Sequence, residues 1–194
     1  MTTPVGVLSL QGDFREHLTT FSRLGISAIP VKRVSELDSV SGLVIPGGES
    51  TTIGKLAKIF GLFDPIVNRI DGGMPVFGTC AGLIMLSDQI EDGLPGQPTF
   101  GGLDVVVQRN AFGNQLDSFE VGIPFTGIEG SIHAAFIRAP LITSIGSKAT
   151  VVSRLEDERV VGVVQERKLG ISFHPEVTGE ERVHKFFYEA LVRA

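Results

Sequence analysis

Short apolar runs alternate with helical patterns through the first half of the chain, and this alternation constrains the fold more than any other feature. Buried strands are predicted at residues 5–10, 26–31, 42–45 and 75–78, because these runs are short and mainly apolar. Helices are predicted at 14–24, with Asp13 as N-cap and Gly25 as stop, between 46 and 73, with breaks at Gly61 and Pro65, and at 81–86. This rhythm predicts an α/β fold of three layers, in which a mostly parallel sheet is flanked by helices.

The second half of the chain has a different pattern. Strands separated by turns are predicted at residues 103–107, 118–121, 132–137, 150–155 and 160–166, and the last two flank a hairpin turn at 156–158. We expect this half to form an antiparallel extension of the sheet. A further buried strand at 169–173 and a closing helix at 179–192 complete the pattern. No linker or repeat divides the 194 residues, which predicts a single domain over 1–194.

Composition and charge exclude several classes of protein. The formal net charge is −5 and no basic run is present, so neither nucleic acid nor an anionic membrane is expected as a partner. The first residues have no basic region before the apolar run, and that run is too short for a signal peptide or a membrane span. One cysteine, Cys80, allows neither an internal disulfide nor a cysteine cluster for zinc. We therefore expect a cytoplasmic protein with no metal site.

The segment Gly-Thr-Cys-Ala-Gly at 78–82 lies between a predicted strand and a predicted helix. Small residues on both sides of Cys80 permit the sharp turn of a nucleophile elbow, which lifts the side chain above the sheet. The following helix N-terminus favours the thiolate, and the backbone N–H of Ala81 is placed to face a developing oxyanion. A small buried apolar role for Cys80 is the alternative reading.

A thiol nucleophile needs a base, and His174 is the candidate among four histidines. It follows the predicted strand at 169–173, and Pro175 favours an extended backbone at the residue before it. In an extended segment, His174 and Glu176 project to the same side, so the carboxylate can orient the imidazole. Helical spacing indicates a structural role for His17 and His184, while His133 stays undecided.

The segment Pro-Gly-Gly-Glu-Ser at 46–50 follows a buried strand and suits a loop whose backbone approaches a ligand closely. It is not a phosphate loop. Five residues separate Gly48 from Gly54 where that motif has four, and Leu56 stands where Ser or Thr would hold the metal. An ordinary turn with a helix cap is the alternative reading.

Taken together, these segments resemble those of class I glutamine amidotransferases, which use a catalytic triad. Further matching segments are Leu-Ser-Leu-Gln-Gly at 8–12, Gln-Arg-Asn-Ala-Phe-Gly at 108–113 and Phe-Ile-Arg-Ala-Pro at 136–140. With them, nearly the whole chain is similar to the glutaminase subunits of pyridoxal 5′-phosphate synthase. The resemblance implies a flavodoxin-like fold and the hydrolysis of L-glutamine to L-glutamate and ammonia.

The resemblance also assigns roles to individual residues. It implies Cys80 as nucleophile, His174 as general base and acid, and Glu176 as the carboxylate that orients the imidazole. The backbone N–H groups of Gly47 and Ala81 would form the oxyanion hole. Glutamine would be bound by Gly48, Glu49, Ser50, Arg109, Ile137 and Arg138. Arginine suits a free amino acid because its guanidinium binds a carboxylate through two hydrogen bonds.

A partner is implied as well. Such subunits pass ammonia to a synthase subunit within a large hetero-oligomeric complex, and Gln11 is a candidate residue of that interface. No metal or organic cofactor is implied for the glutaminase step, since pyridoxal 5′-phosphate is the product of the complex. Other readings stay open at this stage: another cysteine hydrolase or amidotransferase on the same fold, or a non-catalytic binding subunit.

Overall fold

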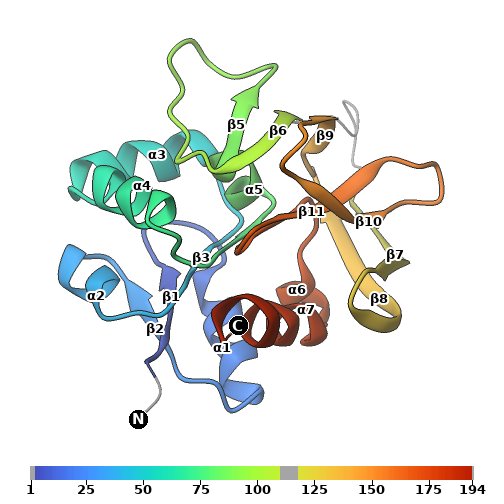
Figure 1. Cartoon of the computed structure of the whole chain (residues 1–194), viewed down its shortest axis with the longest axis horizontal. Coiled ribbons are helices and arrows are strands. Elements are labelled where there is room, and N and C mark those ends of the chain that lie inside the picture. Colours follow the sequence, from blue (N-terminus) through green and yellow to red (C-terminus); the bar gives the residue numbers. More distant parts are fainter. Residues whose placement is uncertain (1–2, 110–117, 194) are drawn as a thin grey trace.

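The computed structural model describes residues 3–109 and 118–193. Its centre is a seven-stranded sheet in the order β10-β11-β12-β4-β3-β1-β2 (Figure 1). Five neighbouring strands of this sheet run parallel: β2 (Ala28–Val31), β1 (Val5–Leu8), β3 (Leu43–Ile45), β4 (Val76–Thr79) and β12 (Lys168–Ile171). The predicted α/β fold with a mostly parallel sheet is therefore confirmed.

Helices cover both faces of the sheet and create two separate cores. On one face, α3 (Ser50–Ile59), α4 (Phe63–Asp71) and α5 (Ala81–Leu86) pack against side chains such as Ile45 and Val76. On the other, α1 (Phe14–Arg23) and the C-terminal helical segment pack against Val44 and Phe77. Consecutive residues of a strand point to opposite faces, so Val44 and Ile45 enter different cores. This arrangement gives the three layers.

Two local predictions for the first half of the chain were incomplete. Pro65 lies inside the first turn of α4 rather than breaking it, because the first helical N–H groups need no intrahelical acceptor. The break falls at Gly61 alone, which has a left-handed backbone with φ of 67°. The short helix α2 (Val34–Asp38) was not predicted from the sequence.

The antiparallel extension of the sheet is smaller than predicted. Only the hairpin of β10 (Thr150–Arg154) and β11 (Val160–Gln165) adds to the central sheet. The other strands form two separate sheets. One contains β5 (Ser87–Ile90), β6 (Leu103–Gln108) and β9 (Leu141–Ile145), and the other pairs β7 (Ser118–Phe125) with β8 (Ile128–Ile137).

The C-terminal helix begins later than residue 179. Gly179 ends the one-turn helix α6 (Pro175–Thr178) in a left-handed conformation. Helical structure then resumes as α7 (Arg182–Phe186), and a wider π-helical turn, η1 (Phe187–Val192), continues it. None of the helices in the described part of the chain has the length and apolar character that crossing a bilayer requires.

Candidate active site

Cys80 occupies a strained turn between β4 and α5. Its backbone has φ of 50° and ψ of −104°, a region that residues other than glycine seldom adopt. Glycine is needed beside it, because a Cβ on Gly82 would lie 2.0 Å from the carbonyl oxygen of Ile45 in β3, and one on Gly78 would lie 2.5 Å from Gly82. The predicted strand–turn–helix context of Cys80 is confirmed, and the backbone N–H of Cys80 donates to Ile171 at the end of β12.

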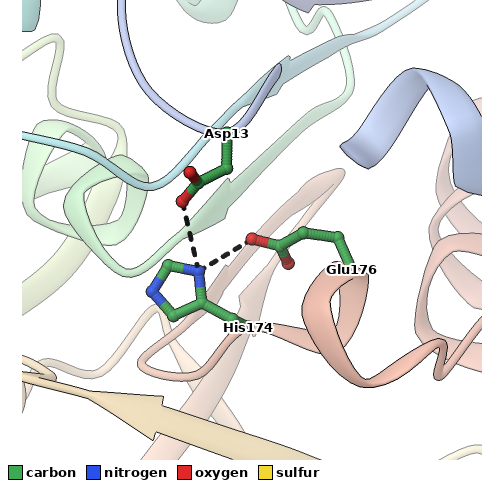
Figure 2. A group of neighbouring side chains, drawn as sticks. All are labelled: Asp13, His174 and Glu176. Carbon is green, nitrogen blue, oxygen red and sulfur yellow. Dashed lines mark hydrogen bonds and ion pairs between the residues drawn. The ribbon is translucent and has the colours of Figure 1, made fainter. Parts of the chain in front are cut away.

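His174 and Glu176 meet at the same end of the sheet. Nδ1 of His174 lies 2.7 Å from Oε1 of Glu176, a hydrogen-bond distance, and both side chains are buried (Figure 2). The predicted reason for this contact was wrong. His174 is the N-cap of α6 and Glu176 lies in its first turn, so a helix start rather than an extended strand brings them together. Pro175 fits here because proline is favoured at the first helical position.

The charges of this pair depend on burial and hydrogen bonds. Burial disfavours the imidazolium, but hydrogen bonds to Cys80 and Glu176 outweigh it and raise the pKa of His174 to about 10. For Glu176, burial raises the pKa, while the hydrogen bond from His174 acts in the opposite direction. A protonated imidazole held by a carboxylate is the kind of neighbour that activates a cysteine nucleophile.

Asp13 joins this group, although the sequence predicted only an N-cap. Its side chain makes no capping hydrogen bond, and Oδ2 lies 3.8 Å from Nδ1 of His174 (Figure 2). Burial raises the pKa of Asp13, and the nearby imidazole opposes this rise. Asp13, His174 and Glu176 bring three potential metal ligands within 4.8 Å. The 2.7 Å separation of His174 and Glu176 suits a shared proton, since two ligands about 2.1 Å from one metal ion stand farther apart.

A cleft opens directly beside the cysteine. It contains all six residues that the resemblance assigned to glutamine binding, together with the two elbow residues and one apolar side chain. Its lining consists of Gly48, Glu49, Ser50, Cys80, Ala81, Ile84, Arg109, Ile137 and Arg138. The structure thus gathers three segments far apart in the sequence around one nucleophile. Asn110 to Gly113, which complete the motif at 108–113, lie outside the described residues.

Polar contacts fix the walls of this cleft. Nη2 of Arg109 lies 2.9 Å from Oε1 of Glu49, and the same carboxylate oxygen accepts from the hydroxyl of Thr51. Glu49 is also the N-cap of α3, so its loop is both a helix cap and a wall of the cleft. Gln97 was missed by the sequence reasoning. Its amide donates to Oγ of Ser50 at 3.0 Å and accepts from Nη1 of Arg109 at 3.1 Å.

The loop that precedes Glu49 lies against the segment from Gln11 to Asp13, near the start of the chain. A Cβ on Gly47 would lie 2.4 Å from Cε1 of His174, so this glycine is in direct contact with the imidazole. The carbonyl of Gly47 accepts from the backbone N–H of Asp13. Oε1 of Gln11 accepts from the backbone N–H of Glu49 at 2.8 Å, which places Gln11 beside the cleft.

The remaining histidines lie in two places. His133 pairs with Glu120 at 2.9 Å on the half-exposed hairpin of β7 and β8, outside the cleft lining. His17 and His184, for which helical spacing indicated a structural role, are fully buried, and His17 lies beside the triad. Nε2 of His17 lies 3.5 Å from Oε1 of Glu176.

Comparison with known proteins agrees with this geometry. Residues 7–193 match the model of the SNO glutamine amidotransferase family. "Pyridoxal 5′-phosphate synthase subunit PdxT" of Leifsonia xyli subsp. xyli is 55% identical over 184 residues, covering 94% of this chain and 93% of the relative. The protein of that name from Streptomyces coelicolor is 52% identical over 194 residues, covering 100% and 95%.

A solved structure gives the same result. A crystal structure described as a glutamine amidotransferase superposes with a TM-score of 0.92 at 46% identity, covering 98% of this chain and 99% of that one. The family model spans the strained cysteine turn, the His174–Glu176 pair and the residues that line the cleft beside Cys80. With a strained cysteine at a strand–helix junction and relatives this similar over nearly their full length, the chain belongs to the SNO glutamine amidotransferase family.

Proposed function

We propose that this chain hydrolyses L-glutamine to L-glutamate and ammonia, and that it delivers the ammonia to the synthase subunit of pyridoxal 5′-phosphate synthase. The observation that carries the proposal is the position of Cys80, which interacts with His174 strongly enough to raise the pKa of that imidazole and which lines the cleft that also contains Arg109 and Glu49. The names of the relatives support the choice of pathway. The proposed location is the cytoplasm.

The first half of the reaction forms a thioester. The Cys80 thiolate attacks the side-chain carboxamide carbon of glutamine, and the carbonyl oxygen becomes an oxyanion held by the backbone N–H groups of Gly47 and Ala81. The protonated His174 then gives its proton to the amide nitrogen, so that ammonia leaves and the C–N bond breaks. Glu176 keeps the imidazole in the orientation that this transfer needs.

The second half regenerates the enzyme. Neutral His174 takes a proton from water, and the hydroxide attacks the thioester carbonyl. The carbon–sulfur bond breaks, glutamate leaves, and Cys80 returns to the thiolate paired with imidazolium. This half uses the same residues and needs no metal or organic cofactor.

Recognition of the substrate depends on opposite charges in the cleft. Free glutamine is a zwitterion, with an α-carboxylate suited to an arginine and an α-ammonium suited to a carboxylate. Arg109 and Glu49 provide this pair of charges and already contact each other in the cleft. In the proposed complex, Arg109 or Arg138 binds the α-carboxylate, while Glu49 and the loop of Gly48 and Ser50 face the α-ammonium. Ile137 packs against the substrate's methylene groups.

Ammonia release tests the proposal and the partner together. The purified chain is incubated with L-glutamine, with and without the synthase subunit of its own organism, and ammonia is measured. We expect release to rise sharply when the synthase subunit is added. Equal release in both conditions would refute dependence on the partner. No release in either condition would refute the glutaminase.

The glutamine specificity of the cleft needs its own test. A glutamine analogue that carries an electrophile at the side-chain end is expected to label Cys80 covalently, and excess L-glutamine is expected to block the labelling. Labelling that glutamine does not slow would favour another cysteine hydrolase. Since Cys80 is the only cysteine in the chain, the labelled site is unambiguous.

A further inference from the structure

A buried row of polar side chains connects the C-terminal helix to the triad. Nε2 of His184 in α7 lies 2.8 Å from Nδ1 of His17 in α1. Nε2 of His17 lies 3.2 Å from Oγ1 of Thr79, the residue before Cys80, and 3.5 Å from Oε1 of Glu176. All of these side chains are buried. His17 therefore contacts both the strand that carries the nucleophile and the carboxylate that orients the base.

The hydrogen-bond partners of His17 and His184 determine which nitrogen of each imidazole carries the proton. Among the described residues, Nδ1 of His184 has no hydrogen-bond partner. A buried N–H without an acceptor is rarer in proteins than an unused lone pair, so the proton of His184 belongs on Nε2 and is donated to Nδ1 of His17. His17 then carries its own proton on Nε2. The opposite assignment would place a nitrogen lone pair against the Glu176 carboxylate.

Both imidazoles are neutral in this position. Burial lowers the pKa of His184 to about 3, and burial together with the neighbouring His184 holds the pKa of His17 well below its usual range. His17 thus places an oriented N–H dipole beside the Glu176 carboxylate, and neither histidine adds a charge. The other titratable groups that face the carboxylate are His174 and Asp13.

Glu176 needs such a neighbour, because its environment offers few donors. Within the described part of the chain, its Oε2 atom is buried with no hydrogen-bond partner. Oε1 is hydrogen-bonded to Nδ1 of His174 at 2.7 Å, and Nε2 of His17, which is also within hydrogen-bond distance of Thr79, lies 3.5 Å from it. The terminal torsion of a glutamate has broad minima, so a second polar neighbour narrows the orientations open to the carboxylate.

We propose that His17 is a positioning residue of the active site: its Nε2–H, oriented by the hydrogen bond from His184, holds the Glu176 carboxylate in place against His174. The inference rests on the proposed glutaminase for its kinetic consequences. The proposal adds two buried histidines, from different helices, to the residues that position the catalytic triad. Neither residue lines the cleft, so in this proposal both act on the reaction through the groups that His17 contacts, above all Glu176.

The test compares three variants of the full chain. His17→Leu removes both ring nitrogens, whereas His17→Gln keeps an N–H donor near the position of Nε2. Thr20→Val is the matched control, because Thr20 is buried on the same helix, valine has the same shape, and its hydroxyl bonds only to the carbonyl of Glu16. Two quantities are measured: kcat and KM for glutamine with the synthase subunit present, and the rate of Cys80 alkylation by iodoacetamide as a function of pH.

For His17→Leu we expect kcat to fall on the order of ten- to a hundredfold with little change in KM, as for other residues that hold a catalytic side chain in place. Alkylation near neutral pH is expected to slow as well, because a poorly held His174 stabilises the thiolate less. His17→Gln should recover most of both quantities, and Thr20→Val should match the wild type. Wild-type kcat and alkylation in His17→Leu would overturn the proposal, and so would equal losses in His17→Leu and His17→Gln.

Alkylation also separates this inference from the proposed function. A wild-type chain that releases no ammonia refutes the glutaminase, while the alkylation rates still decide whether His17 positions the triad. If His17→Leu does not fold, His184→Phe takes its place, since it keeps an aromatic ring between Phe21 and Phe77. Loss of its N–H frees the His17 tautomer, so we expect alkylation to slow several-fold. An unchanged rate would overturn the proposal.

Discussion

Gly47 lies so close to the imidazole of His174 that a Cβ built on it would stand 2.4 Å from Cε1. Gly47→Ala must therefore displace the ring, and a shift of about 1 Å in a catalytic group costs on the order of a hundredfold in rate. We expect kcat to fall by about that factor while the melting temperature changes by only a few degrees. Kinetics and thermal unfolding of the same preparation check this. An alanine variant with wild-type kcat would contradict the contact.

Gly82 packs its Cα against the backbone of β3, where a Cβ would lie 2.0 Å from the carbonyl oxygen of Ile45. Because both sides of this contact are backbone, we expect Gly82→Ala to lower the free energy of unfolding by at least about 1–3 kcal/mol. Gly122→Ala is the control, since its nearest neighbour would stand at 3.6 Å. Urea unfolding measures both. Similar stabilities in the two variants would contradict the close packing of the cysteine turn.

Gln97 connects two walls of the cleft through its hydrogen bonds to Ser50 and Arg109. Gln97→Leu removes both bonds, and a lost hydrogen bond to a charged group is worth about 1.5–3 kcal/mol. We therefore expect KM for glutamine to rise roughly ten- to a hundredfold, with a smaller effect on kcat. Gln89→Leu, at an exposed position of β5, is expected to leave KM unchanged. Equal KM values for the two variants would show that Gln97 does not contribute to glutamine binding.

The raised pKa of His174 predicts how stability depends on pH. Folded His174 keeps its proton up to about pH 10, whereas the unfolded side chain loses it near 6.5. The stability that His174 contributes is complete below pH 6.5 and is lost as the pH rises through 10, by up to about 1.4 kcal/mol per pH unit. Urea unfolding of the wild type and of His174→Gln should show the difference shrinking over this interval. Parallel pH curves would contradict a protonated His174 at neutral pH.

The parallel core of the fold could be predicted because its strands are short and mainly apolar. The runs that became β1, β3 and β4 are short, fully buried and followed by tight turns, so the local pattern alone identifies them. The sequence of the second half of the chain contains no comparable pattern that predicts which strands pair. Its strands were predicted as one extension, yet among the described residues β7 pairs with β8 alone, because strand partners are set by tertiary packing. A single domain over residues 1–194 stays a prediction.

Some features of the site could likewise be predicted from the local sequence, whereas others depend on contacts between distant segments. The turn at Cys80 could be predicted because its two glycines lie within two residues of Cys80 in the sequence. The contact of His174 with Glu176 was predicted correctly, but from an extended backbone that the structure replaces with a helix start. Asp13 and His17 reach the triad only through the packing of α1 against α6, which no local pattern encodes. Family resemblance pointed to Arg109 and Arg138, whose isolated positions otherwise suggest surface charges.

Turnover of glutamine by wild type and by Cys80→Ala, both with the synthase subunit present, tests whether Cys80 is the nucleophile. Alanine retains the Cβ at the strained turn, so the variant is expected to fold and to melt close to the wild type. We expect the wild type to release ammonia and glutamate in equal amounts and Cys80→Ala to release neither. Ammonia release by the alanine variant at a rate comparable to the wild type would contradict Cys80 as the nucleophile.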